Sequence, residues 1–144
     1  MRALTVRQPW AWAIIHGGKD IENRTRNIAG AYRGPIAIHV AKNADLVALT
    51  SLDFVGRIVA TKLFRPEAEW FSNSPASAII GVVDLVDVHH GATYSDESCY
   101  RAPAPGEPCV MPVPRCSPWS MRDHHHLVLA NPRALANPIP ARGR

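Results

Sequence analysis

The sequence lacks long hydrophobic runs: no stretch approaches the roughly 20 apolar residues that a helix needs to cross a bilayer. Its first ten residues, MRALTVRQPW, place Arg7 too early to leave room for the apolar part of a signal peptide. We therefore predict a cytoplasmic protein with no membrane partner.

Cysteine is also scarce, and Cys99, Cys109 and Cys116 form no CxxC pair. A zinc site built from these thiols and the histidines at 124–126 is conceivable. However, intervals of nine and six intervening residues match no usual metal-binding motif. We predict reduced, partly buried thiols, with no metal and no cofactor.

Acidic residues are few near the start of the chain. The first 33 residues carry six basic and two acidic side chains and the rest carries ten of each, so the whole net charge of +4 falls in that segment. A local positive field attracts phosphates and polyanions; the alternative is a basic edge that only water solvates.

Hydrophobic residues make up 47% of the chain, which suits one domain spanning residues 1–144.

The pattern of apolar residues predicts a strand over 2–7 and then a short helix. Pro9 suits the first turn of that helix, because its missing N–H would have no partner there in any case. The helix would present one apolar stripe, formed by Trp10, Ala13, Ile14 and Gly17. The pair Gly17-Gly18 is typical of a helix end.

β-branched and alternating segments predict further strands over 19–26, 34–42 and 77–90, and apolar spacing predicts a second helix over 44–63. Gly81, inside the strongest of these strands, indicates a bulge or a close backbone approach.

The last third of the chain changes character. Six of the thirteen prolines fall within 91–120, which predicts a long proline-rich loop over 91–118 rather than a second domain. A strand over 125–131 follows, then a turn at Asn131-Pro132 and an extended tail. This order predicts an α+β domain whose five or six strands curl into a small barrel, with two helices.

The opening segment, LTVRQPWAWAIIHGGKDIENRTR, resembles the start of an ASCH domain, a member of the PUA-like group of small β-barrels. The matching features are Arg7-Gln8-Pro9-Trp10 after a strand, the helix behind them, and Gly18-Lys19 followed by Glu22 and Arg24. IAIHVAK, with His39, AIIGVVDLVDV and HHHLVLANPRALANPIPARG are similar to later blocks of the family. The resemblance spans nearly the whole chain except the 91–118 loop.

The resemblance implies a cleft beside the first helix, bordered by the segment from Lys19 to Arg24. PUA-like relatives bind RNA or modified nucleobases. Some bacterial ASCH proteins are amidohydrolases that remove the acyl group from N4-acetylcytidine, and ribonuclease activity has been proposed for a family member.

Five residues before and within the first helix are candidate ligand contacts: Arg7, Gln8, Pro9, Trp10 and Trp12. Arg7 could reach a phosphate, or could remain solvated or pair with Glu22. Gln8 could bond a base edge or serve as a cap. Trp10, on the apolar stripe, favours core packing over base stacking, whereas Trp12 points elsewhere and is the better candidate for an exposed stacking ring.

Lys19 and Glu22 are the candidate catalytic pair if the protein is an enzyme. A desolvated lysine can act as a base, and a carboxylate can polarise water or accept a hydrogen bond from cytosine. A surface salt bridge is the alternative. The amidohydrolase branch has a nucleophilic threonine where Glu22 stands, so deacylation by the same mechanism is not expected.

The remaining candidates are weaker. Arg24 and Arg26 would share a face if their segment is extended, and would then suit a phosphate backbone. His39 on a core strand is either a satisfied core histidine or a ligand contact. Asp84 and Asp87 lie on opposite faces of one strand, so at most one can face the cleft. The histidines at 124–126 begin a strand with one ring inward.

Our first hypothesis is a monomeric RNA- or modified-nucleotide-binding domain with a basic cleft. The second is an enzyme, either an N4-acylcytidine amidohydrolase or a metal-independent ribonuclease, that uses Lys19 and Glu22. The third is a protein-interaction module that docks through the 91–118 loop.

Overall fold

The computed structural model describes residues 1–50, 75–91, 106 and 116–142. Most of the predicted 44–63 helix and of the 91–118 loop therefore lies outside the described residues, and so does the docking hypothesis built on that loop. In the part of the chain that is described, no helix combines the length and apolar character needed to cross a membrane.

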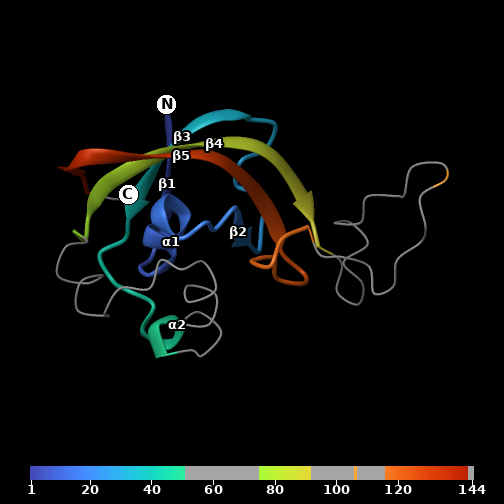
Figure 1. Ribbon diagram of the computed structural model, residues 1–144, viewed down its shortest axis with the longest axis horizontal. Coiled ribbons are helices and arrows are strands. Elements are labelled where there is room, and N and C mark those ends of the chain that lie inside the picture. The colour runs from blue at the N-terminus through green and yellow to red at the C-terminus, as the bar shows by residue number, and fades with distance from the viewer. Residues whose placement is uncertain (51–74, 92–105, 107–115, 143–144) are drawn as a thin grey trace.

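Five strands form one curled sheet with two short helices (Figure 1). In chain order the elements are β1 (Arg2–Val6), α1 (Trp10–His16), β2 (Ile21–Arg24), β3 (Gly34–Val40), α2 (Leu46–Thr50), β4 (Ala78–His90) and β5 (His125–Pro140). The order across the sheet is β1-β3-β4-β5-β2, with β1 and β3 parallel and the other pairs antiparallel. The prediction of a small curled α+β domain is confirmed.

The core lies between the concave face of the sheet and α1, over which β3, β4 and β5 arch in Figure 1. The helix buries Ala11, Ala13, Ile14 and Ile15, and β3 is buried from Ile36 onward. Each fully buried aliphatic side chain contributes about 1.5–3 kcal/mol. Burial against the sheet, rather than helical propensity, therefore stabilises the seven-residue α1.

At Gly81 both α1 and β5 approach β4 closely. A Cβ there would lie 2.5 Å from Cδ1 of Ile15 and 2.7 Å from the backbone oxygen of Arg133. The pairing of β4 with both neighbouring strands also shifts beside this residue. The predicted close backbone approach is confirmed.

The predicted turn at Asn131-Pro132 is wrong, because β5 runs through both residues. They fall between the pairs Val82–Arg133 and Asp84–Ala130, so two residues of β5 stand opposite one of β4. This is a bulge, which accommodates the positive φ of Asn131 (49°) and the missing N–H of Pro132. Asn131-Pro132 therefore forms a bulge within β5 instead of a turn that ends the strand.

Candidate functional site

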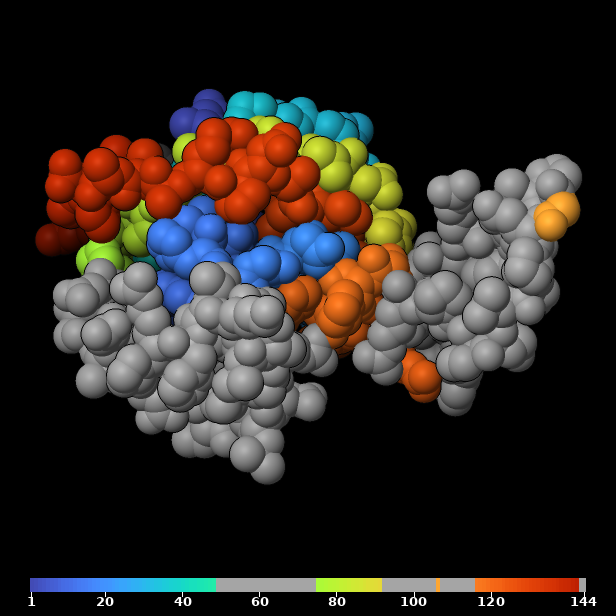
Figure 2. Space-filling view, in the orientation of Figure 1, coloured from blue at the N-terminus to red at the C-terminus, as the bar shows by residue number. Residues whose placement is uncertain are grey.

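An open pocket of about 380 Å³ lies where the two edge strands of the curled sheet, β1 and β2, approach each other. Its volume is within the range of small-molecule sites. Its walls are the end of β1, β2, α1 and the residue after β3: Thr5, Val6, Arg7, Trp10, Glu22, Asn23, Arg24 and Ala41. Figure 2 shows α1 and β2, in blue, reaching the surface beneath β5.

The centre of one wall is an ion cluster of Lys19, Glu22 and Arg24, here named the Lys19 cluster. Lys19 Nζ lies 2.9 Å from Glu22 Oε2, and Arg24 Nη2 lies 3.0 Å from Glu22 Oε1. The Lys19 side chain is 3% exposed and that of Glu22 10%. Two cations share one carboxylate, so the cluster carries a net charge of +1.

Lys19 stands behind the pocket wall rather than in it. Its ammonium also donates to the backbone oxygen of Ile21 and lies 5.9 Å from the centre of the Trp10 ring. Burial lowers the pKa of Lys19, and the attraction of Glu22 offsets only part of that effect. Lys19 therefore fixes the carboxylate that does line the pocket.

Arg24 joins the two edges of the sheet. Its Nη2 donates to the backbone oxygen of Thr5 on β1 over 2.7 Å, while its backbone belongs to β2. Its Nε is buried with no hydrogen-bond partner among the described residues. The extended segment ends at Arg24, so Arg26 lies beyond the strand, exposed and outside the pocket wall.

The residues before and within α1 take different positions. Arg7 is exposed at the pocket wall. Gln8 is buried, and its Oε1 accepts the N–H of Trp12 over 3.0 Å, as the capping alternative requires. Pro9 is also buried, immediately before the helix. Trp12 is half-buried against the cluster of Ala13, Ile21 and Trp119, rather than exposed.

Trp10 both packs in the core and lines the pocket. Its edge meets the ring of Trp119, with centroids 6.4 Å apart, and its Nε1 donates to Asp45 Oδ2 over 3.2 Å. The hydrogen bond from the Ala48 N–H holds the pKa of Asp45 below its usual value, and the bond from the Trp10 indole adds a smaller effect in the same direction. The ring is therefore fixed in orientation where one part of it borders the pocket.

His39 supports the pocket wall from the core. It is 5% exposed, and its Nε2 lies 2.8 Å from the backbone oxygen of Ala141. A carbonyl only accepts, so the ring proton sits on Nε2 and Nδ1 accepts from the Thr5 hydroxyl at 3.2 Å. His39 thus orients Thr5, which lines the pocket.

Neither acid of β4 lines the pocket. Asp84 bonds Arg133 at 2.7 Å and also Asn131, and these bonds lower its pKa to about 2.

Among the histidines at 124–126, only His126 is fully buried, at 0% exposure, which confirms the prediction of one inward ring.

Four wall residues are not among the predicted site residues: the apolar Val6 and Ala41, and the polar Thr5 and Asn23. Thr5 alternates with the buried Leu4 and Val6 along β1, a signal that could have placed it on the opposite face. Asn23 bonds Trp119 and Met121, far along the chain, so no local pattern marks it.

A small α+β domain with a curled sheet and a polar pocket between its edge strands is the class that this fold and pocket define. Residues 4–138 match the ASCH domain, which is nearly the whole chain, and the chain belongs to the ASCH family. ASCH domains have a PUA-like fold that is often linked to RNA binding. No curated protein matches the chain significantly.

Proposed function

We propose that this ASCH domain binds RNA, or a single modified nucleotide, in the pocket between β1 and β2. The observation that carries the proposal is the charge at the pocket wall: Arg7 and Arg24 line it with one carboxylate, Glu22, and the buried Lys19 pairs with that carboxylate from behind. A surplus of positive charge at an open pocket favours an anionic ligand.

The phosphate contact is assigned to Arg7, with Arg24 beside it. Arg7 is exposed at the wall, so its planar guanidinium can form paired hydrogen bonds with phosphate oxygens. Arg24 is held by Thr5 and Glu22, and adds positive charge from a fixed position.

The base contact is assigned to Glu22 and Trp10. A carboxylate can accept a hydrogen bond from the exocyclic amine of cytosine. Trp10 offers an aromatic surface of fixed orientation, and stacking on such a ring is worth about 1–3 kcal/mol per base. Gln8 contributes less, since its side-chain oxygen already caps α1.

Binding of a labelled single-stranded RNA, followed by fluorescence anisotropy across a salt series, tests the proposal. Each phosphate contact contributes a slope of about −0.7 to the plot of log affinity against log salt. Arg7→Ala and Arg24→Ala should each weaken binding and flatten that slope. Arg33→Ala is the matched control, because it removes the same charge far from the pocket. Arg33 precedes the first residue of β3, whereas the pocket lies at the other end of that strand, after Val40. Equal losses in all three variants would refute a localised site, and competition by mononucleotides would distinguish a nucleotide pocket from an RNA surface.

A second candidate function is hydrolysis of N4-acetylcytidine. The observation that favours it is the lowered pKa of the buried Lys19 beside a carboxylate at the pocket wall. Glu22 would remove a proton from water as the water oxygen attacks the acyl carbonyl. That proton would then pass to N4 as the acyl C–N4 bond breaks, which gives cytidine and acetate. Chromatography after incubation with N4-acetylcytidine tests this: cytidine released by the wild type but not by Lys19→Ala supports hydrolysis, whereas no release leaves a binding pocket.

A further inference from the structure

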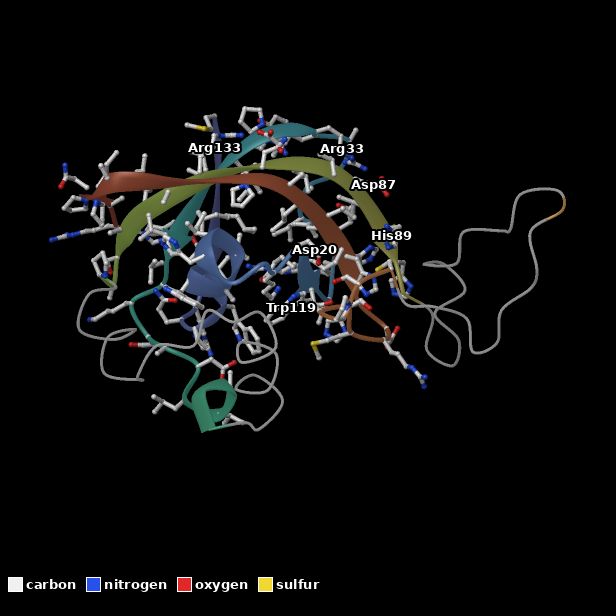
Figure 3. All side chains as sticks on the ribbon, in the orientation of Figure 1. Asp20, Arg33, Asp87, His89, Trp119 and Arg133 are labelled. Atoms are coloured by element: carbon white, nitrogen blue, oxygen red, sulfur yellow. The ribbon has the colours of Figure 1, made fainter. Side chains whose placement is uncertain are left out.

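A second polar cluster lies away from the pocket wall. His89, Cys116 and His126 each offer one ligand atom, and these three atoms all lie within 4.8 Å of one another. We name these three residues the His89 cluster. Figure 3 shows His89 toward the far end of β4, beyond the labelled Asp87.

The register of the sheet brings the two histidines together. His89 of β4 pairs directly with His126 of β5, and their ring centroids are 5.2 Å apart. Cys116, before β5, reaches the same point, with Sγ 3.4 Å from His126 Nδ1. Two strands and a connecting segment therefore converge on one position.

The hydrogen bonds of His126 determine which ring nitrogen faces the cysteine. Its Nε2 lies 2.6 Å from the backbone oxygen of Met121, which can only accept, so the proton sits on Nε2. Nδ1 then presents a lone pair toward Cys116. A ligating histidine whose other nitrogen donates to a carbonyl is the usual arrangement at metal sites.

His89 is oriented in the same way. Its Nδ1 lies 3.2 Å from Asp87 Oδ2, so the proton sits between ring and carboxylate and Nε2 carries the lone pair. That Nε2 is buried and has no hydrogen-bond partner among the described residues. A buried polar atom without a partner calls for an explanation, and a bound cation supplies one.

We propose that His89, Cys116 and His126 bind a divalent transition-metal ion of the Zn²⁺ class, with Cys116 as the thiolate. Two imidazoles and one thiolate are ligands that zinc takes in proteins, with a fourth position left for another ligand such as water. Tetrahedral zinc places ligand nitrogen and sulfur atoms about 3.4–3.6 Å apart. The Sγ–Nδ1 distance of 3.4 Å already fits, and the other pairs need to close by at most about 1.4 Å.

The ion would fix the segment 116–121 to the ends of β4 and β5. Within that segment Ser117 Oγ donates to Asp20 Oδ1 over 2.5 Å, and the Trp119 backbone oxygen accepts from Asn23 Nδ2 over 2.9 Å. Asn23 lines the pocket. The role that follows is structural: the metal holds the segment that supports β2.

Titration of the full chain with Co²⁺ and then Zn²⁺ tests the proposal. We expect one ion per chain and a thiolate-to-cobalt charge-transfer band. His89→Gln and Cys116→Ser should each weaken Zn²⁺ binding by at least about tenfold, because loss even of a residue that only hydrogen-bonds a ligand usually costs that much. His90→Gln, next to His89 but paired with Asp123, should leave it unchanged.

The doubly substituted Cys99→Ser/Cys109→Ser chain is the thiol control, and it should keep the charge-transfer band. Loss of the band in that variant together with its retention in Cys116→Ser would overturn the assignment, as would equal weakening by His90→Gln. If a variant fails to fold, alkylation of the wild type still tests the site. Zn²⁺ should protect Cys116 from iodoacetamide, as followed by mass spectrometry of its peptide, and unchanged alkylation would reject the site.

Discussion

The Lys19 cluster, beside the edge strand β2, and the His89 cluster, where the end of β4 meets the start of β5, are both at least partly buried, yet their hydrogen bonding differs. In the Lys19 cluster every charge has an opposite charge within 3.0 Å. In the His89 cluster two ring protons are assigned to acceptors, and the lone pair of His89 Nε2 has no donor among the described residues. The first arrangement has a surplus of positive charge, which suits an anion, whereas the second has a surplus of lone pairs, which suits a cation.

The largest expected effect concerns charge compensation in the Lys19 cluster. Glu22→Gln keeps the shape of the side chain but leaves the Lys19 ammonium buried without its carboxylate. We expect the free energy of unfolding to fall by about 3–5 kcal/mol, as for other broken buried pairs. Urea denaturation measures it. Asp84→Asn breaks an exposed pair with Arg133 and should cost much less; equal losses would mean that Lys19 is not truly desolvated.

A second contrast uses two glycines, Gly81 in the core against α1 and Gly91 beside the His89 cluster. At Gly81 a Cβ would meet the backbone of β5 and Ile15, so Gly81→Ala should lower the free energy of unfolding by about 1–3 kcal/mol. At Gly91 it would lie 2.6 Å from Cε1 of His126 and would displace that ring. Gly91→Ala should therefore weaken Zn²⁺ binding more than Gly81→Ala does, and the reverse ranking would contradict the placement of His126 as a ligand.

The sequence predicted the elements whose signals are local. The β-branched run of β4, the apolar stripe of α1 and the close approach at Gly81 all follow from short-range patterns and are present in the structure. The sequence also predicts the Lys19–Glu22 pair, because its members lie three positions apart and the ASCH resemblance points to them.

Features that depend on strand register were not predictable. Asn131-Pro132 carries a strong turn signal, but pairing with β4 holds it inside a bulged strand. The spacing of the cysteines gives no sign of the His89 cluster. His89 lies beside Cys116 and His126 because β4 pairs with β5, and that pairing cannot be read from the sequence. The sequence left two roles open for Gln8, a cap or a base contact, and the position at which α1 begins decides in favour of the cap.

The pH dependence of stability tests the burial of Lys19 directly. Burial holds the pKa of Lys19 in the folded chain below its ordinary value of 10.5, so between these two pKa values the unfolded chain binds more protons. The free energy of unfolding contributed by Lys19 should therefore increase as pH rises through the folded pKa toward 10.5. Denaturation of wild type and Lys19→Met across this window isolates the contribution, because other groups cancel in the difference. A difference that stays flat would show a solvated lysine.

The smallest expected effect is coupling between the two regions, and it rests on both proposals. The segment 116–121 contacts the proposed metal through Cys116 and the pocket wall through Asn23, so Zn²⁺ should tighten RNA binding by about fivefold, the lower end of usual coupling. Linkage requires RNA to tighten Zn²⁺ binding by the same factor.

Two serines of this segment show whether the coupling passes through it. Ser117→Ala removes the hydrogen bond to Asp20 and the one that Ser117 Oγ accepts from the Trp119 N–H, and changes neither a pocket residue nor a metal ligand. It should reduce the coupling factor toward one. Ser120→Ala is the matched control, because its hydroxyl donates to the backbone oxygen of Ser117 and so stays within the segment. Coupling that survives Ser117→Ala at full size would mean that the two regions communicate without the Ser117–Asp20 bond, either through Met121, which bonds both Asn23 and His126, or through the direct pairing of Asn23 with His126.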